Sequence, residues 1–212
     1  MTPAFFADIA ANPANRAILG RWQRLGLPDA WLVAGCLFQT VWNLRSSRPP
    51  AQNIKDYDIF YFDSADLSRR GEEQAQQQVD VVLSDLGVTV EVANQARVHL
   101  WYPEFFGHPY PPLASAEDGI ARFLVRETCV GVRPGACHAP YGLEGMYAAL
   151  QAQVGNHLRH HCIVTVVTDA HLHFVLEVDA LDLFQKAMHE VLARLLSIAH
   201  DIQPSVFLGL DP

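Results

Sequence analysis

The segment 53–63, with the sequence NIKDYDIFYFD, constrains the fold of this chain more than any other stretch. After Lys55 its residues are mostly aromatic or β-branched, a composition that favours a β-strand. Alternate side chains of a strand leave the same face, so Asp56 and Asp58 project together, with their Cα atoms about 6 to 7 Å apart. Carboxylates placed in this way suit divalent cations. The segment therefore predicts a strand that carries two candidate metal ligands on one face.

Two other strand-like runs add to this feature. Residues 31–36 (WLVAGC) form an apolar run that leads into Gly35, and residues 88–92 (VTVEV) place Glu91 between two apolar neighbours. A glycine permits close approach of a ligand to the backbone, and an acid on a second strand can join the first two. Gly35 and Glu91 are therefore further candidate site residues.

Length and charge limit the classes of protein to which the chain can belong. A chain of 212 residues can bury a substantial core as one domain, or as one domain with an appendage. A formal charge of −8, with only 15 basic residues, argues against a general nucleic-acid binder, because phosphate neutralisation needs clustered Lys and Arg. The chain has no export signal and no apolar run of membrane-spanning length, so we expect a cytoplasmic protein.

The four cysteines are scattered and contain no Cys-x-x-Cys pair; they are Cys36, Cys129, Cys137 and Cys162. In a protein without an export signal, this predicts reduced thiols rather than a disulfide framework. Their spacing, together with that of the nearby histidines, does not match a structural zinc site.

Hydrophobic periodicity predicts an alternation of helices and strands over the first 150 residues. Asn12 and Pro13 are typical of a helix start, and Ile18, Trp22 and Leu25 continue one helix of about a dozen residues. The next expected elements are, in order, a strand at 31–34, a helix at 37–44, a loop at 45–53, the acidic strand, a crossover helix ending near 86, a strand at 88–92, a continuing strand at 98–102, an irregular loop at 103–115 and a helix at 116–125.

The last third of the chain has its own pattern. It predicts a helix at 143–154, a strand pair at 162–167 and 173–178, and a final helix at 181–198. The predicted fold class is α/β (α+β): a mixed β-sheet flanked by helices in a domain of residues 1–150, with an α/β extension of residues 151–212 packed on the core.

The order of a glycine, an Asp-x-Asp strand and a lone acid on another strand resembles the polymerase-β-like nucleotidyltransferase superfamily. Three blocks carry a closer similarity to an uncharacterised bacterial branch of it: WLVAGCLFQTVWN at 31–43, IKDYDIFYFD at 54–63 and VEVANQARVHLWY at 90–102. A weaker block, PYGLEGM at 140–146, extends the resemblance to about residue 150. From residue 151 onward the resemblance ends.

The resemblance implies the nucleotidyltransferase fold, an NTP substrate and two catalytic Mg²⁺ (or Mn²⁺) ions. It implies that Asp56 and Asp58 ligate both ions and that Glu91, the third acid, shares the ion that activates the attacking hydroxyl. In the wider superfamily the glycine precedes Gly or Ser, which helps to hold the triphosphate. Here Cys36 occupies that place, and a thiol is a weaker hydrogen-bond partner than a hydroxyl.

Four further residues are candidate nucleotide contacts. Asn43, Arg45 and Lys55 lie between the glycine and the acids, and Arg97 follows Glu91 in the third block. Exposed loop charges or structural hydrogen bonds explain such residues equally well, and Lys55 should point to the face opposite Asp56.

These features together predict transfer of a nucleoside monophosphate from an NTP to a hydroxyl-bearing acceptor, with release of pyrophosphate. A small metabolite, an RNA end or another protein remains open as the acceptor, and the acidity of the chain argues mildly against RNA. One alternative is a non-catalytic nucleotide-binding or protein-interaction module on the same fold. Another is a homodimer formed through the last 60 residues, because fold alone does not determine function.

Overall fold

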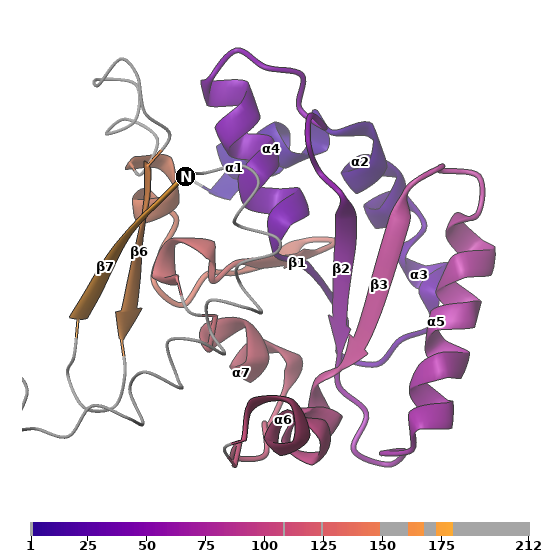
Figure 1. Ribbon diagram of the computed structural model, residues 1–212. Coiled ribbons are helices and arrows are strands. Elements are labelled where there is room, and N and C mark those ends of the chain that lie inside the picture. The colour runs from indigo at the N-terminus through magenta and orange to yellow at the C-terminus, as the bar shows by residue number, and fades with distance from the viewer. Residues whose placement is uncertain (1, 108, 124, 149–160, 168–172, 180–212) are drawn as a thin grey trace, which may run out of the picture.

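A five-stranded mixed sheet forms the centre of the computed structural model, which describes residues 2–107, 109–123, 125–148, 161–167 and 173–179 (Figure 1). Its strands are β1 (Trp31–Val33), β2 (Asp56–Tyr61), β3 (Thr89–Asn94), β4 (Gly131–Arg133) and β5 (Ala136–His138), in the spatial order β3-β2-β1-β4-β5. The β2–β3 pair is parallel and the other pairs are antiparallel. The predicted mixed sheet with flanking helices is confirmed.

The helices are mostly short. They are α1 (Thr2–Ala10), α2 (Pro13–Gly20), α3 (Trp22–Leu25), α4 (Gly35–Arg45), α5 (Arg69–Leu83), α6 (Val98–Phe106) and α7 (Ala116–Ala121), with 3₁₀ turns η1 (Gln95–Arg97) and η2 (Arg126–Thr128). A further helical segment covers 144–148. No helix among these described residues is long and apolar enough to cross a membrane.

The main core lies on one face of the sheet. Tyr57 and Ile59 of β2 point into it, and α1, α2, α4 and α5 cover it with apolar side chains that include Phe5, Ile9, Ile18, Leu37, Val41, Val79 and Leu83. The crossover helix α5 runs alongside β3 (Figure 1) and connects the two parallel strands, as the sequence predicts. Apolar burial on this side leaves the other face of β2 available for polar groups.

The other face carries only a small apolar cluster under α7. Trp31 and Val33 of β1 pack there against Ala116 and Ile120, with Phe60 of β2 at the margin. A Cβ on Gly131 would lie 2.6 Å from Ile120 Cδ1, so a larger residue there would have to displace the end of the Ile120 side chain of α7. This glycine in a strand is the sequence signal for the close approach, and the sequence reasoning did not use it.

The helix predicted to begin at Asn12 is two helices. The Asn12 side chain caps α2 by accepting a hydrogen bond from Ala14 N at 3.0 Å, as predicted. At Arg21 the backbone leaves the helical region (φ −105°, ψ 9°), and α3 continues only to Leu25. Gly26 ends the second helix in the left-handed region with φ 65°, which a side-chain-bearing residue rarely adopts.

The prediction of a strand at 98–102 is wrong, because these residues begin α6. The cause lies just before them: the Asn94 side chain accepts a hydrogen bond from Ala96 N at 3.1 Å, which ends β3 and starts a helical turn. Helix α6 then continues through Pro103 to Phe106, so the irregular segment begins later than predicted. The Ser115 cap of α7 is as predicted, but the helix ends at Ala121 rather than near residue 125.

The remaining described strands form the β4–β5 hairpin and the β6–β7 pair. The β4–β5 hairpin, with Gly135 at φ 77° in its turn, was not predicted, although Pro134-Gly135 is a common turn pair. Strands β6 (His161–Val167) and β7 (His173–Asp179) pair antiparallel at the predicted positions. The predicted loop at 168–170 and helix at 181–198 lie outside the described residues, and packing of the extension on the core stays a prediction.

Candidate active site

Three carboxylates lie on the face of β2 and β3 that is turned away from the main core. Asp58 is the register partner of Glu91 on the neighbouring parallel strand, and Asp56 precedes Asp58 by two residues. Paired residues share a face and neighbouring strands lie about 4.8 Å apart, so Asp58 and Glu91 are adjacent across the ladder. Between the two aspartates, Tyr57 is buried in the core. The predicted placement of these acids on one face therefore agrees with the register.

The charges of the three acids act on one another. Burial raises the pKa of the Asp58 carboxyl from its ordinary 3.8 to about 7, and the negative charges of Asp56 and Glu91 add to the rise. Loss of water around a carboxylate disfavours its charged form, and like charges nearby disfavour it further. A bound cation would reverse both effects. The central acid of the cluster thus titrates near neutral pH in the absence of a counter-ion.

The donor set fits a hard divalent cation such as Mg²⁺ or Mn²⁺. All three side chains offer carboxylate oxygens, the ligands that these ions prefer. Among the described residues, no three metal-ligating side chains are already gathered into one coordination group. Binding of such an ion by the three acids therefore stays a prediction.

The start of α4 lies beside the acids. Val33, the last residue of β1, is the register partner of Asp58, and α4 begins two residues later at Gly35. No side chain caps this helix start, and a Cβ on Gly35 would meet nothing within 4 Å. Backbone N–H groups and the positive end of the helix dipole suit a phosphate at such a place. The phosphate contact by Gly35 stays a prediction, and the open, uncapped helix start is compatible with it.

The side chain of Cys36 lies in the main core, which contradicts the predicted nucleotide contact by its thiol. Cys36 is fully buried, and its Sγ donates to the Val33 carbonyl at 3.2 Å. Burial, with a smaller contribution from the Asp58 charge, raises the pKa of the thiol well above its ordinary value. Helix geometry turns this side chain inward one residue after the open Gly35, so only the backbone of Cys36 remains available to a ligand.

Asn43 and Arg45 are not brought to the acids. They follow Gly35 by eight and ten residues on α4, which corresponds to about 12 and 15 Å along the helix axis. Buried Asn43 donates through Nδ2 to the carbonyls of Pro50 and Gln52, at 3.2 and 2.8 Å, and so holds the loop before β2. The Arg45 guanidinium lies 5.2 Å from the centre of the Tyr147 ring. Asn43 therefore has a structural role, whereas the side chain of Arg45 is exposed and its nucleotide contact stays a prediction.

Lys55 and Arg97 do not join the acids either. Lys55 is exposed immediately before β2, where strand alternation directs it away from the face of Asp56. Arg97 is the last residue of η1, which connects the end of β3 to the start of α6. It forms an ion pair with Glu72 and donates to the Leu67 carbonyl at 3.0 Å. These donors hold the connection before α5, and a nucleotide contact by Arg97 stays a prediction.

Asn94 has a structural role at the ends of β2 and β3. Its Nδ2 donates to the carbonyls of Asp63 and Asp66, at 2.9 and 3.3 Å, and its Oδ1 accepts from Asp63 N at 3.0 Å. The amide therefore joins the ends of β2 and β3 while its residue is 1% exposed. This contact helps to fix the register that places Asp58 beside Glu91.

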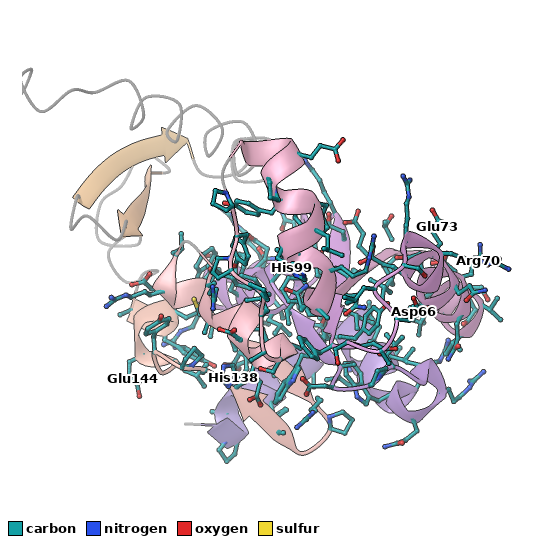
Figure 2. All side chains as sticks on the ribbon, turned by 90° about the horizontal axis from the view of Figure 1, so that it is seen from below. Asp66, Arg70, Glu73, His99, His138 and Glu144 are labelled. Atoms are coloured by element: carbon teal, nitrogen blue, oxygen red, sulfur yellow. The ribbon has the colours of Figure 1, made fainter. Side chains whose placement is uncertain are left out.

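His138 lies on the same face of the sheet as the acids, but at some distance from them. This is the face turned away from the main core, which we call the open face. Register pairs continue from Asp58 through Val33 and Gly131 to His138 on the last strand, β5 (Figure 2). Three strand spacings separate His138 from Asp58, about 14 Å between Cα atoms. Its ring lies 6.0 Å from that of Trp31. His138 is therefore too far away to ligate an ion held by the acids.

Comparisons with known proteins agree with this geometry. A protein-family profile described as nucleotidyltransferase matches residues 20–162. A solved NMR structure, described as revealing a CCA-adding enzyme head domain, is 27% identical, with a TM-score of 0.55 over 65% of this chain and 70% of that chain. No curated protein matches the chain at a comparable level. Because the family profile covers more than half of the 212 residues, the chain belongs to this nucleotidyltransferase family.

Proposed function

We propose that the protein transfers a nucleoside monophosphate from an NTP to a hydroxyl-bearing acceptor and releases pyrophosphate. One observation carries the proposal: three carboxylates share the open face of β2 and β3 beside an uncapped helix start. Acids at this position suit divalent cations, and the helix start suits phosphate. Membership of the nucleotidyltransferase family supports an NTP as the substrate.

Each part of the site has a role in the proposed reaction. Asp56 and Asp58 hold Mg²⁺ or Mn²⁺, and Glu91 shares one ion. When bound, two such ions stabilise the attacking and the leaving oxygen of an in-line displacement. The N–H groups at Gly35 and Cys36 bind the phosphate oxygens of the NTP.

The protein's contribution is mainly position and charge. Glu91 orients the acceptor hydroxyl and accepts its proton as the oxygen attacks the α-phosphorus. The bond to the bridging oxygen then breaks, and pyrophosphate leaves with that electron pair. Holding the reactants in line and surrounding them with fixed charges accounts for most of the rate gain in reactions of this kind.

The acceptor is a small metabolite, an RNA end or a protein, and the charge distribution favours the first and the last. The formal charge is −8. Five of the described arginines already pair with acids: Arg21, Arg69, Arg97, Arg122 and Arg133. Arg70, on α5, points outward from the molecule, away from the sheet (Figure 2). A polyanionic acceptor would gain little from such a surface.

Labelling distinguishes catalysis from simple nucleotide binding. The protein is incubated with each α-labelled NTP, Mg²⁺ and cell extract, and labelled acceptors are separated by size and nuclease or protease sensitivity. We expect an acceptor that the wild type labels and Asp58→Asn does not. Glu73→Gln, which removes an exposed acid paired with Arg69 on α5, is the matched control and should label normally.

A non-catalytic nucleotide-binding module is the second candidate. The inward side chain of Cys36 favours it, because the site then lacks the hydroxyl that can help to hold the triphosphate in the wider superfamily. Metal-dependent NTP binding by the wild type without any labelled acceptor would select this candidate and contradict transferase activity.

A further inference from the structure

A network of buried polar side chains lies directly behind the start of α4. Asn12, Asn15 and Thr40 are 0% exposed and Tyr57 is 2% exposed, within an otherwise apolar core. They come from the start of α2, from α4 and from β2. Buried polar groups reduce stability unless hydrogen bonds satisfy them, so their contacts indicate what the network holds.

One branch of the network holds the first turn of α4. The Cys36 carbonyl accepts a hydrogen bond from Thr40 Oγ1 at 2.7 Å and another from Asn15 Nδ2 at 2.8 Å. Asn15 Nδ2 also donates to the Ile9 carbonyl at 3.2 Å, at the end of α1. Two side chains therefore hold the carbonyl of the peptide that joins Cys36 to Leu37, in the first turn of α4.

The other branch reaches the acidic strand. Asn12 Nδ2 donates to Thr40 Oγ1 at 3.1 Å and to the Tyr57 hydroxyl at 3.2 Å. Tyr57 stands between Asp56 and Asp58 and projects to the opposite face. The same hydroxyl of Thr40 thus connects the helix start to the strand that carries both aspartates.

The network contains an atom that reduces stability. Asn15 Oδ1 is buried and has no hydrogen-bond partner in the described structure. An unpaired buried acceptor carries its full desolvation penalty, and an apolar side chain of the same shape would avoid it. Stability alone does not explain an asparagine here, whereas its donor contacts to the carbonyls of Cys36 and Ile9 do.

We infer that Asn12, Asn15 and Thr40 are positioning residues for the nucleotide site, and this inference rests on the proposed function. They act through backbone groups: they fix the peptide N–H groups at the start of α4 relative to Asp56 and Asp58. Asn12 and Asn15 precede residue 20, where the match to the family profile begins. The N-terminal helices therefore contribute to the site without touching the nucleotide.

The test is Thr40→Val, which removes the shared hydroxyl at nearly constant volume, with Thr40→Ser as the conservative rescue. NTP affinity in Mg²⁺ and the thermal midpoint are measured for each protein. We expect NTP binding to weaken about tenfold in Thr40→Val and to stay within about twofold of wild type in Thr40→Ser. A second variant, Asn15→Leu, removes the unpaired acceptor with the donor, so it should fold and weaken NTP binding in the same way.

A matched control separates positioning from stability. Val41→Ala opens a cavity in the same core one residue along α4, from a side chain that is 0% exposed. It should lower the thermal midpoint and leave NTP affinity unchanged. Amide chemical shifts of Gly35 and Cys36, measured without NTP, should move in Thr40→Val and not in Val41→Ala.

The outcomes distinguish this inference from the proposed function. If the wild type binds NTP and Thr40→Val and Asn15→Leu bind it equally well, the inference is overturned and the proposed function stands. If the wild type binds no NTP, the proposed function fails and the inference fails with it. Weakened binding in Val41→Ala as large as in Thr40→Val would assign the effect to stability and overturn the inference.

Discussion

At the scale of single residues, Asp58 is the most informative side chain of the protein. Its burial and its two acidic neighbours raise its pKa from 3.8 to about 7. Between these two values the folded protein binds a proton that the unfolded chain has released. Stability conferred by this group is therefore complete at low pH and is lost as pH rises towards 7.

We predict that the metal-free protein becomes less stable between pH 5 and pH 7.5, by roughly 3 kcal/mol, since the pKa shift of about three units corresponds to about 4 kcal/mol at most. Denaturant unfolding at several pH values measures this. The Asp58→Asn protein should lose most of the pH dependence. Arg21 lowers the pKa of its partner Asp85 to about 2, so Asp85 changes the stability only in more acidic solution. An equal slope in wild type and Asp58→Asn would contradict the assignment.

A second conclusion at the scale of single residues is that the side chain of Cys36 belongs to the main core. Cys36→Leu should destabilise the protein by about 1 to 3 kcal/mol, because the site is fully packed. Burial and the raised pKa should also make the native thiol react slowly with thiol reagents, relative to the half-buried Cys137. Rapid modification of Cys36 in the folded protein, or unchanged stability of Cys36→Leu, would place its side chain on the open face instead.

At the scale of elements, the turn from β1 into α4 is under backbone strain. Ala34 has φ 61° and ψ −142°, a conformation that glycine adopts readily and other residues rarely do. The pairing of β1 with β2 on one side and the hydrogen bonds to the Cys36 carbonyl on the other hold this turn in place.

Ala34→Gly should therefore stabilise the protein by about 1 kcal/mol, because relief of strain exceeds the added flexibility of glycine in the unfolded chain. Ala34→Val should destabilise it by at least as much, because a branched side chain tolerates positive φ less well. Thermal melts of both variants beside wild type measure the effect. A glycine variant less stable than wild type would show that the turn is not strained.

The elements that the sequence predicts well are those with a local signal. The acidic strand, the crossover helix and the Asn12 and Ser115 caps follow from alternation, periodicity and capping chemistry. The segment 98–102 is a helix although its aromatic and β-branched residues favour a strand, because the Asn94 side chain caps a helical turn just before it. That cap is also a local signal, and strand propensity outweighed it in the prediction.

In the candidate site, too, some features follow from local sequence patterns and others depend on contacts between residues distant in the chain. The shared face of Asp56 and Asp58 follows from strand period alone, and the nearness of Glu91 follows from a parallel crossover. The roles of Asn43, Arg45 and Arg97 depend on contacts with Gln52, Tyr147 and Glu72, which lie up to about a hundred residues away in the chain. No local pattern encodes such contacts, so the sequence alone does not separate a structural role of these residues from a nucleotide contact.

At the scale of the whole molecule, the sheet separates stability from chemistry. One face carries the main apolar core, and the other carries α7 against β1 and β2 together with the acids of β2 and β3. Because of this division, the charged carboxylate side chains lie on rigid strands and stay outside the main core. The polar groups that do lie in that core include the network behind α4.

The central claim is that Asp56, Asp58 and Glu91 bind divalent metal together with an NTP. Calorimetric titration of each NTP into the protein, with Mg²⁺ and then with EDTA, tests it most directly. We predict that the wild type binds at least one NTP only with Mg²⁺, and that Asp58→Asn and Glu91→Gln bind it at least tenfold more weakly, a loss of about 1.4 kcal/mol or more. Glu73→Gln should bind like wild type. NTP binding that survives both EDTA and Asp58→Asn, or no NTP binding by the wild type at all, would contradict the claim.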